Sequence, residues 1–250
     1  NRSPKPIKQV AKYGAIPAYS IEELCSKLGK KKIVWIMIKS GKPVDDTIKS
    51  LLPFLNKGDL IIDGGNSFYT DSVKRHKALA KKGIGYLDIG VSGGIESARN
   101  NACMMVGGKP KYFKMVEPAL KAMCAKNGYA LVGKEGAGHF VKMVHNGIEY
   151  GMVGAIAEGM QALKKHEKKF DISLDEAIKV YGHQSIIDSR LTGWLASGWK
   201  NYKKLTTIPG KVPMGETEAE MKHLESIADM KVLKTSRLMR VATRKKPSFA

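Results

Sequence analysis

Cysteine and long apolar runs are both scarce in this 250-residue chain. Its three cysteines, Cys25, Cys103 and Cys124, form no CxxC pair and no disulfide framework of the kind that staples small secreted domains. No apolar run approaches the ~20 residues that a membrane-spanning helix needs. We therefore predict a reducing, cytoplasmic setting without membrane association.

Acidic residues are also few, because 43 Lys and Arg stand against 23 Asp and Glu and give a formal net charge of +20. A field of this sign attracts anions such as phosphorylated metabolites, nucleotides and nucleic acids. The excess is concentrated near the end of the chain, where basic residues recur every third position: Lys231, Lys234, Arg237 and Arg240, followed by Arg244. This segment is either a solvated basic helix face or a segment that contacts phosphate.

The first half of the chain alternates short apolar runs with amphipathic segments, which favours a doubly wound α/β sheet. Strands are expected within 31–41, 59–67, 85–94, 102–108 and 129–133. Helices are expected over 43–58, with Pro53 bending or ending the first, and over 70–82 and 110–125. Beyond Gly138 helical patterns dominate, at about 138–165, 173–182, 184–197 and 217–241. We predict a partial dinucleotide-binding domain over 1–135 and a helical substrate and dimerisation domain over 136–250.

The strand–GxGxxG–helix motif that normally opens a dinucleotide-binding domain is missing from the sequence. We expect the chain to begin after that first strand and helix, at the tip of the second strand. Asn1, Arg2 and Ser3 would then lie where an arginine accommodates the 2′-phosphate of NADP. The alternative for these three residues is a polar turn before Pro4.

Two glycine-rich loops follow predicted strands and carry polar side chains: DGGNS at 63–67 and VSGG at 91–94. Ligands of open α/β sheets bind outside the carboxyl ends of the strands, and glycine lets backbone N–H groups approach them closely. Asn66 and Ser92 add directional hydrogen bonds. Either loop alone could be an ordinary tight turn, but two on one sheet edge favour a binding site.

The stretch GAGHFVKMVHNGIEYGM, residues 136–152, places Lys142, His145, Asn146 and Glu149 within an arc of roughly 100° on a helix. Lys142 can act as a general base and Glu149 as an acid, while His145 and Asn146 can orient a polyhydroxy substrate. A solvent-facing stripe with a structural histidine is the alternative. The sequence has no HExxH motif and no clustered Cys and His, so no metal site is predicted.

Together these motifs resemble the decarboxylating 6-phosphogluconate dehydrogenases, particularly the shorter bacterial branch. IIDGGNS, DIGVSGG and GHFVKMVHNGIEYG look like that family's motifs, and Gly138, Lys142 and Asn146 match the GxxxKxxxN pattern of the wider β-hydroxyacid dehydrogenase superfamily. The resemblance implies a Rossmann-like sheet followed by a helical domain and a homodimer or higher homo-oligomer. It also implies conversion of 6-phosphogluconate to ribulose 5-phosphate and CO2, with NADP, or NAD, as hydride acceptor and no metal.

The resemblance also implies a role for each matched residue. Lys142 would take the proton of the 3-hydroxyl group, and Glu149 would help to protonate the enediol carbon. The implied substrate-binding residues are Asn66, Ser92, Gly93, Gly94, His145, Asn146, Tyr150, which would contact the phosphate, and Arg190. The predicted cofactor-binding residues are Asn1, Arg2, Ser3, Lys39 and Asn66. The Asn-Arg-Ser start favours NADP over NAD.

The sequence departs from the family pattern at several positions. Ile95, followed by Glu96, stands where a glutamate often follows VSGG, and Asp188 stands where the family usually has a phosphate-binding arginine. Arg190 is then the nearest candidate for that arginine. Residues 215–220 read GETEAE where the short branch has a GEGRWT-like segment. Phosphate recognition is therefore the part of the site that the motifs define least.

Two other functions stay open. A dehydrogenase of a smaller acid, such as 3-hydroxyisobutyrate, would keep VSGG and GxxxKxxxN without requiring His145, Glu149 and Tyr150 together. A catalytically idle basic scaffold would instead use its charge to bind a polyanion. The intact Lys/His/Asn/Glu set favours an enzyme, and no motif predicts a specific nucleic-acid partner.

Overall fold

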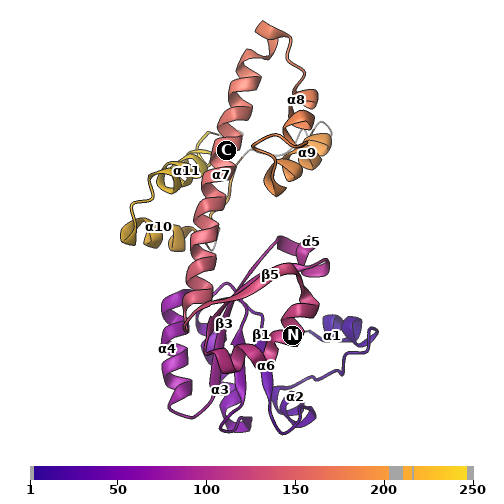
Figure 1. Ribbon diagram of the computed structural model, residues 1–250, viewed down its shortest axis with the longest axis vertical. Coiled ribbons are helices and arrows are strands. Elements are labelled where there is room, and N and C mark those ends of the chain that lie inside the picture. Colours follow the sequence, from indigo (N-terminus) through magenta and orange to yellow (C-terminus); the bar gives the residue numbers. More distant parts are fainter. Residues whose placement is uncertain (1–2, 203–210, 216, 247–250) are drawn as a thin grey trace. The chain divides into compact units, whose positions relative to one another are not determined.

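The computed structural model describes residues 3–202, 211–215 and 217–246. The chain separates into two compact units, residues 1–142 and residues 143–250, and the division falls inside one long helix, α7 (Ala137–Phe170). Figure 1 shows the mixed sheet of the first unit and the helices of the second. The functional division into domains 1–135 and 136–250 remains a prediction.

The first unit is built on a five-stranded sheet in the order β1-β2-β3-β4-β5. Its strands are β1 (Ile33–Ile36), β2 (Leu60–Asp63), β3 (Gly85–Ser92), β4 (Ala102–Gly108) and β5 (Cys124–Gly133). The first three are parallel, β4 runs antiparallel to β3, and β5 is parallel to β4. The predicted α/β class is confirmed, with one antiparallel step in a sheet that is otherwise parallel.

The helices of this unit lie partly where the sequence placed them. They are α1 (Pro4–Ala11), α2 (Ile21–Lys27), α3 (Lys42–Leu51), the 3₁₀ helix η1 (Leu52–Phe54), α4 (Tyr69–Ala80), α5 (Gly94–Arg99) and α6 (Pro110–Met123). The helix expected over 43–58 ends at Leu51 as an α-helix, because Pro53 has no backbone N–H to continue the ladder, and the last turn tightens to 3₁₀.

Three short helices, α1, α2 and α5, were not predicted. The start of α2 could have been predicted from the sequence, because Ser20 and Glu23 have the spacing of a capping box and form one. The Ser20 hydroxyl accepts from the Glu23 N–H at 3.0 Å, and the Glu23 carboxylate accepts from the Tyr19 N–H at 2.7 Å.

Apolar side chains bury both faces of the sheet. Along β2, Ile61 packs with Val44 and Ile48 of α3, whereas Leu60 and Ile62 pack in a second cluster with side chains of α6. Successive residues of a strand point to opposite faces, so a strand buried on both sides reads as a continuous apolar run. This packing fixes the carboxyl ends of β1 and β2 side by side, where the polar loops begin.

The second unit is helical. Beyond α7 it contains α8 (Leu174–Tyr181), α9 (Arg190–Tyr202), α10 (Glu218–Ile227) and α11 (Lys231–Ala242). The single helix expected over 217–241 is wrong, because the backbone at Ala228 is extended and separates α10 from α11. The helix expected from 184 begins only at Arg190, after Gln184 adopts a left-handed φ of 60°.

The sequence pattern also predicts an irregular loop around Leu205 to Pro213, and most of these residues lie outside the described part of the chain. Across the part of the chain that the structure does describe, no helix combines the length and apolar character needed to cross a bilayer.

Candidate functional site

Two loops of the first unit meet at the carboxyl ends of β1 and β2, whose last residues, Ile36 and Asp63, are paired in the sheet. The loop after β1 carries the exposed Lys39, and the loop after β2 carries the half-buried Asn66. A Cβ on Gly65 would come within 2.8 Å of the Ile38 carbonyl oxygen, so glycine is needed where the loops touch. The structure thus places two of the predicted cofactor-binding residues on adjoining loops.

The predicted VSGG loop lies at the end of β3. Ser92 ends the strand, and Gly93 and Gly94 follow with left-handed φ angles of 116° and 69°, a conformation that favours glycine. Ser92 and Gly93 are half-buried and Gly94 is exposed. Ile95 is 81% exposed, so this departure from the family pattern does not contribute to the apolar core.

The start of α7 is held by a carboxylate that the sequence analysis did not single out. Asp88 of β3 is fully buried, and its two oxygens accept hydrogen bonds from the backbone N–H groups of Gly136 at 2.7 Å and His139 at 2.9 Å. A negative charge at this end satisfies unpaired N–H groups and complements the helix dipole. Asp88 therefore fixes where α7 leaves the sheet.

Two glycines, Gly138 on α7 and Gly90 on β3, let α7 cross directly over the strands. A Cβ on Gly138 would collide with the Asp88 carbonyl and lie 2.6 Å from the Met105 carbonyl oxygen and 2.8 Å from the Gly107 nitrogen. A Cβ on Gly90 would collide with the Cβ of Lys142. The GxxxK spacing thus has a structural cause. Gly138 lets the helix approach the sheet closely, and the Cβ of Lys142, one turn later, lies over Gly90 of β3.

A further buried contact joins α7 to α4. The hydroxyl of Ser72 and Nδ1 of His139 are 2.7 Å apart, and both side chains are buried. This histidine is a separate residue from the predicted His145. Its backbone and side chain both anchor the first turn of α7, which positions Lys142 relative to Ser92 within the first unit.

The remaining predicted residues of the motif lie on α7 in the second unit. Nδ1 of His145 is 3.4 Å from Oδ1 of Asn146 and 3.9 Å from Oε2 of Glu149. Asn146 is buried, while the side chains of His145 and Glu149 are 38% and 43% exposed. The imidazole therefore lies next to the amide of Asn146 and within ion-pair distance of the Glu149 carboxylate.

Tyr150 has two neighbours that sequence reasoning did not assign to the site. Its hydroxyl is 3.0 Å from the Thr217 hydroxyl, and the Arg240 guanidinium lies 4.3 Å from the centre of its ring. In the sequence, Arg240 is distinguished only as one member of the basic stripe. Its contact with the predicted phosphate-contacting tyrosine makes it a stronger anion-binding candidate than Arg190, which is exposed at the start of α9.

Other basic residues of that stripe are engaged within the second unit. Arg237 donates two hydrogen bonds to Glu225, at 2.6 and 2.9 Å, and Arg244 pairs with Glu218. These guanidinium groups hold the pKa values of Glu225 and Glu218 below their usual range. Charges neutralised in this way contribute little to a surface for polyanions, which weakens the scaffold interpretation.

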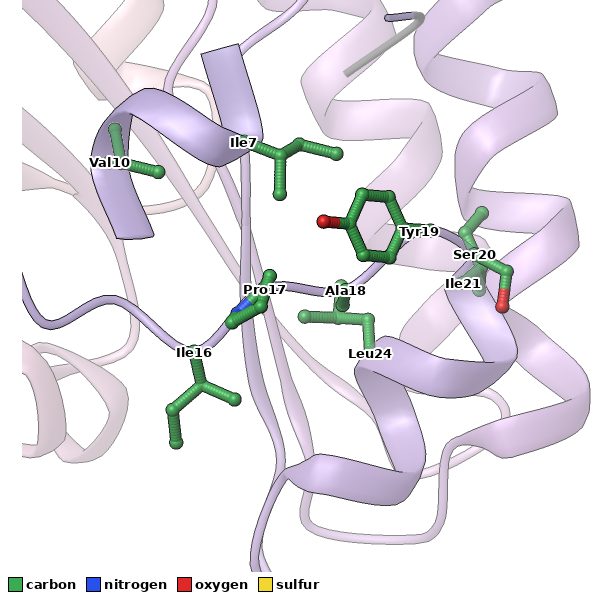
Figure 2. Close-up of a pocket in the computed structure, with 9 residues that line it drawn as sticks. All are labelled: Ile7, Val10, Ile16, Pro17, Ala18, Tyr19, Ser20, Ile21 and Leu24. Atoms are coloured by element: carbon green, nitrogen blue, oxygen red, sulfur yellow. The ribbon is translucent and has the colours of Figure 1, made fainter. Parts of the chain in front are cut away.

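The predicted residues at the start of the chain are only partly visible. Asn1 and Arg2 lie outside the described residues, and Ser3 is exposed immediately before α1. Figure 2 shows a cavity of about 390 Å³ between α1 and α2, lined mainly by apolar side chains that include Ile7, Leu24 and Tyr19. Among the described residues, its lining includes no charged side chain and none of the predicted site residues, so these walls do not suit a phosphorylated sugar acid.

Comparison with known families matches both parts of the chain. Residues 1–133 match the model described as the NAD binding domain of 6-phosphogluconate dehydrogenase, and residues 138–189 match the 6-phosphogluconate dehydrogenase C-terminal domain.

Individual relatives agree with these matches. A Bacillus subtilis protein named as a candidate 6-phosphogluconate dehydrogenase, YqeC, is 40% identical over 204 residues, which cover 82% of this chain and 68% of that protein. The decarboxylating 6-phosphogluconate dehydrogenase of Haemophilus influenzae is 50% identical over 155 residues, covering 60% of this chain and 32% of that enzyme. The matched segment thus spans about a third of the length of that enzyme.

Solved structures show the same architecture. The 6-phosphogluconate dehydrogenase of Plasmodium falciparum, determined in its apo form and with NADP+ and 6-phosphogluconate, superposes with a TM-score of 0.87 at 29% identity and covers 98% of this chain and 56% of that one. A 3-hydroxyisobutyrate dehydrogenase of Mycobacterium tuberculosis superposes with a TM-score of 0.69 at 18% identity, covering 98% of this chain and 84% of that one. At that identity the likeness concerns the fold alone.

Proposed function

The chain belongs to the 6-phosphogluconate dehydrogenase family, and from this premise we propose that it catalyses the oxidative decarboxylation of 6-phosphogluconate to ribulose 5-phosphate and CO2, with NADP as hydride acceptor. The observation that carries the proposal is the anchoring of Lys142 over β3, two residues before Ser92, by Asp88 and Gly138. The same helix continues into the contact between His145, Asn146 and Glu149.

The loops after β1 and β2 fit a nicotinamide cofactor. Met37 and Ile38 are 60% and 41% exposed at the end of β1, where they offer apolar cover for a flat ring, and Lys39 adds a cation for a phosphate. When bound there, such a cofactor would supply the hydride acceptor for C3 of the sugar acid. The preference for NADP over NAD rests on Arg2, whose planar donor fork suits a 2′-phosphate.

The residues of this chain would divide the proton transfers between them. Lys142 accepts the proton of the 3-hydroxyl group as the hydride leaves C3, which yields a 3-keto acid. That acid loses CO2 by cleavage of its C1–C2 bond, and the electron pair forms an enediolate. Glu149 then delivers a proton to C2, which gives ribulose 5-phosphate. Asn66, Ser92 and Asn146 supply the hydrogen bonds that hold the hydroxyl groups.

Phosphate recognition is assigned to Tyr150 and Arg240. Replacing Arg240 with alanine should raise the KM for 6-phosphogluconate roughly 10- to 100-fold, because a charge-assisted hydrogen bond contributes about 1.5–3 kcal/mol. The kcat should change much less, since the phosphate is remote from the reacting carbons. Lys231→Ala is the matched control: Lys231 lies on the same helix, α11, and its side chain is 86% exposed. An equal rise in KM for both variants would contradict the assignment.

The proposed reaction is tested by nicotinamide absorbance and CO2 release with the purified chain. We expect NADP reduction with 6-phosphogluconate, one CO2 released per NADPH formed, and slower reduction of NAD. Reduction with 3-hydroxyisobutyrate but not with 6-phosphogluconate would replace the proposed substrate by a smaller acid. Binding of 6-phosphogluconate in a calorimeter without any turnover would reject the enzymatic proposal and leave a binding protein.

A further inference from the structure

We propose that Arg75 is a positioning residue for this reaction: it holds the loop that carries Asn66 against the loop that carries Lys39. The proposal rests on the proposed function for its kinetic consequences, but its structural part stands on the first unit alone. Arg75 lies on α4, is 6% exposed, and was not among the residues that the motifs single out.

The Arg75 guanidinium clamps both ends of the turn that bears Asn66. Its Nη1 donates to Oδ2 of Asp63 at 3.1 Å and to the hydroxyl of Ser67 at 3.2 Å. Asp63 is the last residue of β2, and Ser67 follows Asn66 directly. The turn between them is Gly64-Gly65-Asn66, whose two glycines have little intrinsic preference for one conformation. The Arg75 hydrogen bonds therefore restrict the conformation of a turn whose own sequence restricts it little.

The same guanidinium reaches the neighbouring loop with its other two nitrogens. Nη2 donates to the Gly41 carbonyl oxygen at 3.1 Å, and Nε donates to Oδ1 of Asp45 at 2.7 Å. Gly41 ends the loop that carries Lys39, and Asp45 lies in the first turn of α3. One side chain thus spans the ends of both loops at the edge of the sheet.

Charge and geometry together explain why this position needs arginine. Asp63 is fully buried, and its Oδ2 also accepts from the Tyr86 hydroxyl at 3.1 Å. Burial and the nearby Asp63 carboxylate raise the pKa of Tyr86 well above its usual value, so this phenol stays a neutral donor. Arg75 is the cation that compensates Asp63. A lysine would keep that charge but offers a point-like ammonium, which cannot reach four acceptors as a planar fork does.

The consequence for catalysis is alignment. Lys39 and Asn66 are predicted to contact the cofactor, and Asn66 also the substrate, so the spacing of the two loops sets how hydride donor and acceptor meet. Reactions of this kind are sensitive to displacements of about 1 Å, which can cost about 10²-fold in rate. Loosening the clamp should therefore impair both cofactor binding and turnover, although Arg75 itself would touch neither ligand.

The experiment compares Arg75→Lys, Arg75→Gln and Lys74→Gln by amide hydrogen exchange and steady-state kinetics. Lys74→Gln is the matched control, because Lys74 is the preceding residue of α4, is largely exposed and pairs with Asp71. For Arg75→Lys we expect exchange to accelerate at least tenfold in residues 37–41 and 64–68, with the strands unchanged. We also expect KM for NADP to rise and kcat to fall at least tenfold, and Lys74→Gln to match the wild type.

Two results would overturn the proposal. One is faster exchange spread evenly over the first unit, with activity reduced only in proportion to the folded fraction, which would make Arg75 merely structural. The other is unchanged loop exchange in Arg75→Lys. Arg75→Gln leaves Asp63 buried without its cation and could fail to fold. The Arg75→Lys variant is therefore the one that tests the positioning role. Amide hydrogen exchange is measured without substrate. If the proposed activity is absent, the exchange rates of the two loops therefore still test the structural part of the proposal.

Discussion

Replacing Lys142 with alanine should lower turnover of 6-phosphogluconate about 10²- to 10⁴-fold, the usual contribution of a positioned proton-transfer group. The fold should survive, because the Lys142 side chain is only half-buried and α7 is held by Asp88, Gly138 and His139. The measurement is the initial rate of NADP reduction at saturating substrate, with circular dichroism to confirm the helical content. Binding of a polyanion should be unchanged, which separates the enzyme from a basic scaffold.

Two further variants sharpen this result. Lys142→Arg keeps a positive charge but cannot release its proton in a protein, so a general base predicts the same loss as alanine. Lys164→Ala removes a lysine from an exposed pair with Glu167 on the same helix and should leave the rate unchanged. Full activity in Lys142→Arg would show that only the charge matters and would reject Lys142 as the base.

The sequence predicted the parts of the site that local motifs encode. Ser92 lies at the end of a strand and Lys142 lies on a helix, as predicted, because strand–loop order and helical spacing are local properties. Asp88 was missed although it gave a signal: it stands within the apolar run of a buried strand, and a carboxylate there needs a partner. Its partners, the N–H groups of Gly136 and His139, come from a helix much later in the chain.

Arg240 and Arg75 illustrate what local patterns do not encode. Arg240 matched a basic helical stripe, and only the packing of α11 reveals that it stacks on Tyr150. Arg75 looked like one cation among several on α4, and its burial depends on two loops from other strands. The direction of β4 was likewise open, because an apolar run has the same pattern in a parallel and an antiparallel pair. Long-range contacts decided all three features.

The contact of α7 with the sheet gives the second large prediction. Gly138→Ala should destabilise the chain by about 3 kcal/mol or more, because the new methyl group meets backbone atoms of Asp88, Met105 and Gly107 that no rotamer change can move. The helix must lift from the strands, which weakens the hydrogen bonds that Asp88 accepts from its first turn. Urea denaturation followed by circular dichroism measures the change, and turnover should fall as Lys142 is displaced.

Gly159→Ala is the matched control, since it is the same substitution on the same helix, and a Cβ at Gly159 meets nothing within 4 Å. At Gly159 the substitution should stabilise the chain by about 0.4–1 kcal/mol, because alanine restricts the unfolded state and favours helix. Helix propensity acts equally at both positions. Changes of opposite sign in the free energy of unfolding would therefore isolate the effect of the contact with the sheet. If Gly138→Ala were as stable as Gly159→Ala, close approach to β3 and β4 would not be what fixes Lys142 at that strand end.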